Sequence, residues 1–474
     1  LLGAWVVVAE TSVQLKKRFI YDALFMVGLA ICMVAIRYYE EHMRFPGITA
    51  LIPALAVAMM IFSGERSRLS SIFANATARF FGKISYSLYL VHWPLVVFYK
   101  NIHGYHLSLA DKSVLLATSV VLAWLLWRYV EQPFRRGSGK STGMSDKRFY
   151  AGLASAVSVV ICLSYLAYSQ NGFLWRLNQK SQSVYKSYKQ ELVKRTLCKE
   201  KNAVAPGGFG CFGDQSKDPA KVLLIGDSHV NNFVYGLSDL LAELGVKGRF
   251  RVANGCPPIM GATVIHLAFP AWSGVCDRSR NISFREARKE QFDVVVLAGR
   301  WSLYTNVTRL GVTGSQTELF LGMSPDDERN PQRSQFVFRT KMESTIRDLV
   351  NNHKKVIVFG QVPDIGFEVK RCLFRPNFFN LELAGCSLLT TREMKDNIAF
   401  TNETLQHIAQ EFPGQVLYLD SSLAFCQPDC EYMQGDIPLY TDNNHLAYSG
   451  SLKVVQQFSG EIERFIADAR AKPD

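Results

Sequence analysis

The sequence predicts two different structures in one chain: part of an α-helical transmembrane bundle, followed by an α/β/α domain with a mainly parallel sheet. Long uncharged apolar runs recur before residue 170, whereas short apolar runs alternate with helical patterns after Lys221. The charge divides at the same place, because residues 1–170 contain 17 Lys and Arg against 8 Asp and Glu, and the rest contains 36 against 33. We therefore predict a membrane domain over residues 1–170, with a final exporting helix at 149–169, and an α/β domain over 219–474.

Five apolar runs indicate helices that cross a membrane. About 20 apolar residues span the hydrocarbon core, and flanking Tyr, Trp and Lys extend the shorter runs. Buried helices of a soluble protein are the alternative, but five such runs with short connections are difficult to place in a soluble core. The runs cover residues 23–36, 45–64, 84–99, 113–127 and 149–169, with a partial run at 1–9. Because the chain starts inside that partial run, we expect it to be a fragment that earlier membrane helices precede.

Basic residues between these runs predict their orientation. Alternate connections hold 13 of the 17 Lys and Arg residues, and the positive-inside rule places those connections in the cytoplasm. The run at 149–169 then leaves the cytoplasm, and all later residues lie across the bilayer. The basic balance thus reflects membrane topology. We expect no nucleic-acid partner, because the sequence carries no nucleic-acid-binding signature.

The cysteines support an exported second part. Cys32 and Cys162 lie in membrane runs, and the other eight fall after residue 170 as four pairs of near neighbours. An even set of this kind is typical of a disulfide-bearing domain in an oxidising compartment, and the spacing does not indicate zinc. Pairing between neighbours is the simplest hypothesis. It gives Cys198–Cys211, Cys256–Cys276, Cys372–Cys386 and Cys426–Cys430.

Strand and helix patterns after the membrane part predict a parallel sheet. Residues 171–218 form a polar, Lys-rich connector, interrupted by Pro-Gly-Gly at 206–208. Beyond it, buried strands alternate with helices, which is typical of a parallel sheet with helices on both faces. The strand runs are "KVLLIG", "RFRVAN", "FDVVVLAG", "KKVIVFGQV" and "QVLYLD", and helices are expected at 230–245, 335–352 and 450–469.

A short polar motif follows the first strand, at the sheet edge where functional side chains gather. It consists of Gly226, Asp227, Ser228 and His229. Gly226 allows a sharp turn, and Ser228 would lie beside backbone N–H groups that can hold an oxyanion. The alternative is that Asp227 and Ser228 only cap the next helix.

A second motif, at the far end of the domain, favours catalysis. Asp442 precedes His445 by three residues. A nucleophilic serine needs an imidazole to take its proton and a carboxylate to orient that imidazole. This spacing can place both side chains on one side of a loop or first helical turn. The pair is weak evidence alone, but the two motifs together predict Ser-His-Asp chemistry.

Several longer segments now resemble known families. "LLIGDSH", "NGCPP" at 254–258 and "DNNHLAYSG" at 442–450 resemble the SGNH/GDSL hydrolase-like domain that is appended to membrane acyltransferases. "GKISYSLYLVHWPL" at 82–95 and "YVEQPFRR" at 129–136 resemble the late helices of acyltransferase family 3. The combination is similar to bacterial O-acetyltransferases that modify O-antigen or other envelope polysaccharides.

The resemblance implies a role for each motif residue. Ser228 would be the nucleophile, His445 the general base and Asp442 its orienting partner. The backbone N–H groups of Ser228 and Gly255 would supply two donors of the oxyanion hole.

The third block departs from the family pattern. Gly299, Arg300 and Trp301 stand where these enzymes usually have Gly-x-Asn, so the asparagine donor is missing. Asn254, Arg300 and the Trp301 indole are the candidates to replace it.

The membrane half carries weaker candidates. His92 lies inside a membrane run, where an ionisable residue is a functional candidate, although packing between helices explains it equally well. Tyr86 lies in the same run, and Glu131 is expected to anchor a helix end by pairing with Arg128 or Arg135. The resemblance assigns the catalytic membrane histidine to an early helix that this sequence lacks, so we expect the first acyl-transfer step to be missing.

The resemblance also implies a function and a place for it. The complete protein would take acetyl groups from cytoplasmic acetyl-CoA, without a bound cofactor or metal, and Ser228 would deliver them to a hydroxyl of an envelope glycan such as lipopolysaccharide O-antigen. The chain would span the bacterial inner membrane, with its C-terminal domain in the periplasm. A membrane-tethered esterase that removes acetyl groups is the alternative, because the same triad hydrolyses esters. A glycan-binding module on a membrane anchor is the third hypothesis.

Overall fold

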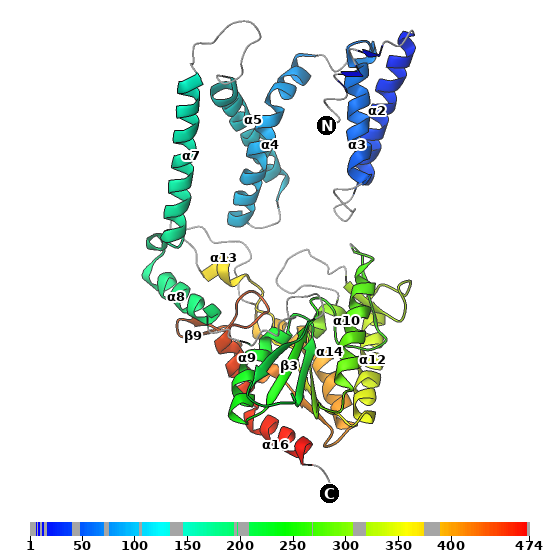
Figure 1. The fold of residues 1–474 in the computed structure, drawn as a ribbon, viewed down its shortest axis with the longest axis vertical. Coiled ribbons are helices and arrows are strands. Elements are labelled where there is room, and N and C mark those ends of the chain that lie inside the picture. Colours follow the sequence, from blue (N-terminus) through cyan, green and yellow to red (C-terminus); the bar gives the residue numbers. More distant parts are fainter. Residues whose placement is uncertain are drawn as a thin grey trace. The chain divides into compact units, whose positions relative to one another are not determined.

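The computed structural model of the chain forms two compact units, over residues 1–158 and 159–474 (Figure 1). It describes residues 17–39, 48–70, 75–103, 107–132, 146–193, 208–267, 269–306, 319–373 and 389–471, together with residue 197 and a few positions before residue 17.

The first unit is helical. Within it α2 packs on α3 and α4 packs on α5. The helix α5 begins at a capping box, in which the Ser108 hydroxyl accepts from the Asp111 N–H and the Asp111 carboxylate accepts from the Ser108 N–H. The elements are α2 (Arg18–Tyr38), α3 (Ile48–Gly64), α4 (Ala76–His103), α5 (Leu109–Leu125), the π-helical η2 (Leu126–Glu131) and α7 (Asp146–Ser169), whose second half belongs to the second unit.

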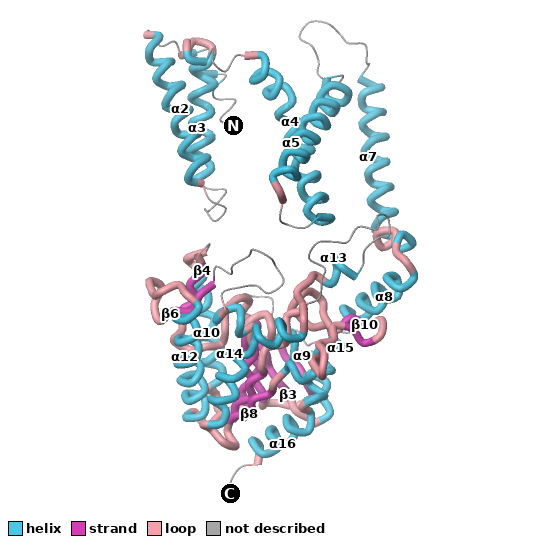
Figure 2. Tube along the Cα trace, turned by 180° about the vertical axis from the view of Figure 1, so that it is seen from behind, coloured by secondary structure: helices cyan, strands magenta, loops and turns pink. Residues whose placement is uncertain are grey.

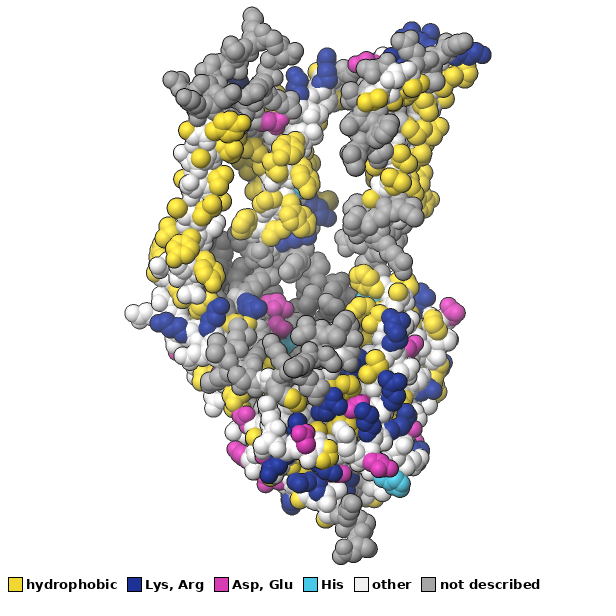
Figure 3. Space-filling model, in the orientation of Figure 1, with side chains coloured by type: hydrophobic (Ala, Val, Ile, Leu, Met, Phe, Trp, Pro, Cys, Tyr) yellow, Lys and Arg dark blue, Asp and Glu magenta, His cyan; other side chains and the backbone are white. Residues whose placement is uncertain are grey.

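Three helices in the described part of the chain are long and apolar enough to cross a membrane. They are Arg18–Tyr38, Leu109–Glu131 and Tyr150–Ser169. The apolar helix α3 is shorter, and α4, with 28 residues, is not among the three. All five predicted runs thus contain helix, but only three have the length and composition of a span. The partial run at 1–9 lies mostly outside the described residues. Figure 3 shows hydrophobic side chains over the outer surfaces of these helices.

The second unit contains a six-stranded sheet, in the order β1-β3-β2-β5-β7-β8. Every neighbouring pair is parallel except β1 and β3. The five predicted strands are confirmed, while β1 was not predicted and makes the sheet mixed. The strands are β1 (Gly210–Gly213), β2 (Val222–Gly226), β3 (Lys247–Val252), β5 (Val294–Ala298), β7 (Lys355–Phe359) and β8 (Val416–Leu419). Two short antiparallel pairs join β4 (Thr263–His266) to β6 (Leu319–Gly322) and β9 (Met433–Gln434) to β10 (Ile437–Pro438).

Helices cover both faces of this sheet, as Figures 1 and 2 show. Alternate residues of β2 belong to different cores: Val222 and Leu224 pack with α9, α15 and α16, whereas Leu223 and Ile225 pack with α10, α12 and α14. The helices are α8 (Gln179–Val193), α9 (Val230–Glu243), α10 (Trp272–Ala287), α11 (Trp301–Thr305), α12 (Pro331–Asn351), α13 (Val369–Leu373), α14 (Thr391–Gln410), α15 (Tyr448–Gln457) and α16 (Ser459–Arg470), with short turns η3 (Leu174–Arg176) and η4 (Ser421–Ala424).

Two features differ from the sequence-based expectation. The single helix expected at 450–469 is two helices, because Phe458 leaves the helical conformation at φ −119° and buries its ring in the core. The connector at 171–218 contains α8, which packs on the domain. Val184 and Tyr188 of α8 are buried, and Glu191 accepts a 2.6 Å hydrogen bond from the Ser449 N–H.

Disulfides fix two loops of the second unit. Cys256–Cys276 joins the loop after β3 to α10, and Cys426–Cys430 closes a short loop after η4. These two pairs confirm half of the neighbour-pairing hypothesis. Cys211 and Cys372 are also disulfide-bonded, while Cys198 and Cys386, their expected partners, lie outside the described residues.

Replacing Gly236 with alanine tests how α9 packs on α15. A Cβ there would lie 2.3 Å from the backbone oxygen of Ser451, so the helices must separate. We expect the free energy of unfolding to fall by about 1 to 3 kcal/mol. Gly460→Ala is the matched control, because a Cβ at this exposed position of α16 meets nothing within 4 Å. Urea unfolding followed by tryptophan fluorescence compares them, and equal midpoints for Gly236→Ala and the unchanged protein would contradict the packing.

Candidate active site

The structure brings the three predicted triad residues together. Ser228 lies in the turn between β2 and α9, and Asp442 and His445 lie in the loop before α15. The Ser228 Oγ is 2.8 Å from His445 Nε2, and His445 Nδ1 is 2.8 Å from Asp442 Oδ2. Because a carboxylate only accepts, Nδ1 carries the proton of the neutral ring and Nε2 accepts from the serine hydroxyl. This is the geometry that a serine nucleophile requires.

Asp442 is held ionised by its hydrogen bonds. Burial alone raises its pKa, but the hydrogen bond and charge of His445 and two backbone N–H groups lower the pKa to about 2. Those groups belong to Asn444 and His445, at 2.9 and 2.7 Å from Asp442 Oδ1. The carboxylate is therefore available at neutral pH to orient the imidazole.

Asp227 joins the serine turn to the segment that follows β5. One of its oxygens accepts from the His229 N–H at 2.8 Å, and the other accepts from the Arg300 N–H and the Tyr304 hydroxyl, each at 2.9 Å. Burial raises the pKa of Asp227, against the effect of these three donors. Asp227 bonds the first N–H of the turn into α9, but the Ser228 hydroxyl contacts His445 instead, so capping alone does not describe this motif.

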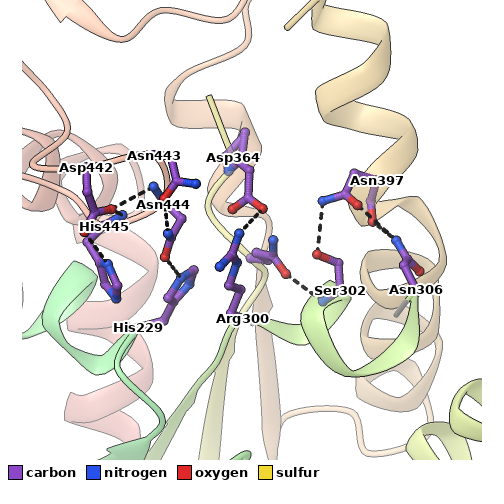
Figure 4. Close-up of polar contacts among 12 residues, drawn as sticks. His229, Arg300, Ser302, Asn306, Asp364, Asn397, Asp442, Asn443, Asn444 and His445 are labelled. Atoms are coloured by element: carbon purple, nitrogen blue, oxygen red, sulfur yellow. Dashed lines mark hydrogen bonds and ion pairs between the residues drawn. The ribbon is translucent and has the colours of Figure 1, made fainter. Parts of the chain in front are cut away.

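His229 supports the loop that carries the triad base. It is fully buried, its Nε2–H donates to Asn444 Oδ1 at 3.0 Å, and its ring centroid lies 5.2 Å from that of His445 (Figure 4). Burial lowers the pKa of His229 well below its usual value, and the charges of His445 and Arg300 lower it further. One turn later, Asn232 Oδ1 accepts from the Leu446 N–H at 2.9 Å. The start of α9 therefore positions the catalytic loop.

A cavity of about 240 Å³ opens beside the serine. Gly255, with a left-handed φ of +66°, also lines it, so the two residues whose backbone donors are implied for the oxyanion hole share one pocket. Its described lining residues are Asp227, Ser228, Gly255, Arg300, Leu303, Tyr304, Glu368, Asn443, Asn444 and His445. Among the residues that the structure describes, no three or more His, Cys, Asp or Glu side chains group to hold a metal ion.

The structure separates the three candidates for the missing donor. Trp301 is wrong as a donor, because its ring is buried in the core and its indole N–H donates to the Phe359 carbonyl at 2.9 Å. Asn254 is exposed and is not among the described lining residues. Arg300 lines the pocket.

Two acidic residues of the site were not predicted. Asp364 accepts a 2.7 Å hydrogen bond from the Arg300 guanidinium, and Glu368 lines the exposed side of the pocket. Burial raises the pKa of Glu368, and the charge of Asp442 raises it further. Both residues follow β7, at the sheet edge where functional residues gather, so their position after "KKVIVFGQV" is the signal that could have found them.

The membrane-half candidates are placed within the first unit. His92 Nδ1 lies 2.9 Å from the Tyr89 carbonyl of its own helix, and the ring lines a cavity of about 590 Å³ between α4 and α5. Tyr86 is exposed, and Glu131 accepts from the Ser87 hydroxyl at 2.9 Å. Arg135, one of its expected partners, lies outside the described residues.

The low pKa of Asp442 predicts a pH-dependent contribution to stability. A depressed pKa stabilises the fold above the unfolded value of 3.8, and the gain disappears as the pH falls towards 2. The Asp442 side chain is 34% exposed, so solvent screens part of this effect. We expect the ionised carboxylate to contribute about 1 to 2 kcal/mol to the free energy of unfolding at pH 6. Urea unfolding of Asp442→Asn between pH 6 and 2 measures it, with Asp436→Asn, on an exposed turn, as the control for losing one charge. If the loss of unfolding free energy in Asp442→Asn is the same at every pH, the prediction is contradicted.

Known proteins resemble the second unit. The model of the family described as SGNH domain (fused to AT3 domains) matches residues 197–460, more than half of the chain. No curated protein matches. The periplasmic domain of a lipopolysaccharide acetyltransferase from Salmonella ser. Paratyphi A is 17% identical, with a TM-score of 0.39, and the match covers 59% of this chain and 96% of that one. A proposed acylhydrolase from Bacteroides fragilis NCTC 9343 is 13% identical, with a TM-score of 0.26, over 53% of this chain and 91% of that one. By the family match and its own α/β architecture, this chain belongs to the family of SGNH domains fused to AT3 domains.

Proposed function

We propose that this protein transfers an acetyl group to a hydroxyl of a cell-envelope polysaccharide, with Ser228 as the covalent carrier. The observation that carries the proposal is the hydrogen-bonded chain from Ser228 through His445 to Asp442, two contacts of 2.8 Å beside a pocket. Membership of a family whose SGNH domains are fused to AT3 domains supports acyl chemistry, by transfer or by hydrolysis. Helices able to cross a membrane support work at the cell envelope.

The triad geometry defines the first step. The Ser228 oxygen attacks the acyl carbon of the donor while its proton moves to His445 Nε2, and the carbonyl electron pair moves onto the oxygen in the pocket. Collapse of this intermediate breaks the bond to the leaving group, which takes the proton from His445. The second step reverses the first, with an acceptor hydroxyl in place of the leaving group, and frees Ser228 as the new ester departs.

The division of the chain explains why a carrier serine is useful. Acetyl-CoA is the expected donor and is a cytoplasmic compound, whereas the disulfides of the second unit favour an oxidising compartment. We infer that the complete membrane domain supplies the acetyl group across the inner membrane and that the second unit works in the periplasm. Lipopolysaccharide O-antigen is the glycan that the sequence resemblance suggests.

Hydrolysis is the second candidate function, because water can replace the acceptor hydroxyl in the second step. The exposed carboxyl of Glu368 at the pocket favours transfer, since it can hold a sugar hydroxyl by accepting its proton in a hydrogen bond. An esterase and a transferase therefore share Ser228 and differ in the species that deacylates it.

Ser228→Ala tests the covalent carrier in cells that make the intact protein. We expect the acetyl ester content of the envelope polysaccharide to fall to background, because the proposed acyl intermediate is an ester of the Ser228 hydroxyl. Mass spectrometry of the isolated polysaccharide measures it, and Ser344→Ala, an exposed serine of α12, should keep the full content. An unchanged ester content in Ser228→Ala would contradict the mechanism. A rise in that variant would identify a deacetylase.

A labelling experiment on the purified full chain distinguishes transfer from hydrolysis. With an acetyl-labelled ester donor and an excess of polysaccharide acceptor, we expect label on the polysaccharide in an amount that increases with acceptor concentration. Release of all label as free acetate at every acceptor concentration would establish the esterase instead. Ser228→Ala is the control for uncatalysed transfer.

The volume of the pocket predicts a short acyl group. Leu303 is 9% exposed and borders a cavity of about 240 Å³. We expect rates with p-nitrophenyl esters to fall from acetate to hexanoate, and Leu303→Ala to shift the preference towards longer chains by about tenfold or more. Leu319→Ala, at a leucine of β6 with similar burial outside the lining, is the matched control. An unchanged chain-length profile in Leu303→Ala would exclude Leu303 as the limit.

A further inference from the structure

Arg300 directly precedes Trp301, which stands where the family pattern has its asparagine donor. Its backbone cannot serve, because the Arg300 N–H already donates to Asp227 Oδ2 at 2.9 Å. Arg300 lines the pocket together with Ser228 and Gly255. Figure 4 shows this side chain between His229 and Asp364. The side chain is thus the part of Arg300 that can act on a bound group.

Asp364 fixes the guanidinium of Arg300 but uses only part of its N–H donors. One terminal nitrogen of Arg300 lies 2.7 Å from Asp364 Oδ2, and that carboxylate is itself buried. A guanidinium has five N–H donors, and the buried Nε of Arg300 has no hydrogen-bond partner. The side chain is only 11% exposed and is held at one end, so its unused donors are fixed in direction, because rotation would break the contact with Asp364.

The charge of Arg300 is maintained in this surrounding. Burial lowers the pKa of the guanidinium, but Asp364, Asp227 and Asp442 together raise it above its ordinary value. A fixed positive charge in an enclosed pocket stabilises a developing negative charge more strongly than a neutral amide does, because little water screens it.

We propose that the guanidinium of Arg300, positioned by Asp364, is the third donor of the oxyanion hole and replaces the missing asparagine amide. It acts with the backbone N–H groups of Ser228 and Gly255. When the serine–carbon bond forms, the carbonyl electron pair moves onto the oxygen and the serine proton moves to His445. Arg300 stabilises that oxygen without giving up a proton. The electron pair returns when the leaving group departs with the proton from His445.

This proposal rests on the proposed acylation of Ser228, and one assay separates the two. The detergent-solubilised full chain reacts with p-nitrophenyl acetate, and intact mass detects acetyl-Ser228. If the unchanged protein is not acetylated there, the proposed function fails. If it is acetylated and Arg300 variants react as the unchanged protein does, only the role of Arg300 fails.

Arg300→Met removes the charge and the donors while keeping an unbranched side chain. We expect kcat to fall about 10²- to 10³-fold with KM changed less than about threefold, because the interaction exists only in the transition state. Arg300→Lys and Arg300→Gln restore a charge or an amide donor and should each recover about tenfold or more. Arg251→Met is the control, since Arg251 is buried but bonds Ser279 away from the pocket.

A tetrahedral anion gives an independent measurement. Phenylboronic acid adds to a catalytic serine as a boronate that mimics the intermediate, so its inhibition constant should rise in proportion to the loss of kcat/KM across the three variants. A loss below threefold in Arg300→Met, a change in KM alone, or unchanged boronate affinity would each overturn the assignment. An equal loss in all three variants with a lower unfolding midpoint would make Arg300 structural and overturn it as well.

Discussion

The buried carboxylate of Asp227 is the constraint on which the active site depends. A carboxylate taken out of water is costly unless its oxygens are hydrogen-bonded, and this one accepts from His229, Arg300 and Tyr304. The donors come from the start of α9 and from the segment after β5. The strands approach so closely at this point that a Cβ on Gly226 would lie 1.8 Å from the Ala298 oxygen. The turn of the nucleophile and the turn of Arg300 are therefore one rigid unit.

A second set of hydrogen bonds fixes the short helix that follows Arg300. Gln361, just after β7, accepts from the Ser302 N–H at 2.7 Å, and Asn397 of α14 donates to the Ser302 hydroxyl at 3.0 Å. Asn306 in turn donates to the Asn397 carbonyl, as Figure 4 shows. These contacts set the rotation of α11. As a result the side chain at position 300 faces the pocket and that at position 301 enters the core.

Much of the fold and the triad could be predicted from the sequence, for identifiable reasons. A central strand such as β2 is apolar on both faces and stands out as a run, and Ser228, Asp442 and His445 lie in two short motifs. The orientation of Trp301 could not be predicted, because neighbouring residues in an irregular turn have no fixed periodicity. Asp364 was missed because its partner is 64 residues away. The break at Phe458 was missed because the nearby glycine, Gly460, lies inside the following helix and does not mark the break. The helix α8 was missed because three buried residues do not dominate a polar segment.

The burial of His229 has a consequence for how the site handles charge. Two imidazoles lie side by side, with centroids 5.2 Å apart, yet burial keeps one of them neutral. The only N–H of His229 donates to Asn444, and its other nitrogen, Nδ1, is buried. His229 can therefore neither receive the serine proton nor return it. His445 Nε2 is consequently the one nitrogen of this imidazole pair that can take the serine proton, and it holds one proton at a time. Acylation and deacylation must each begin and end with His445 Nε2 unprotonated. The two steps are therefore coupled through one nitrogen atom.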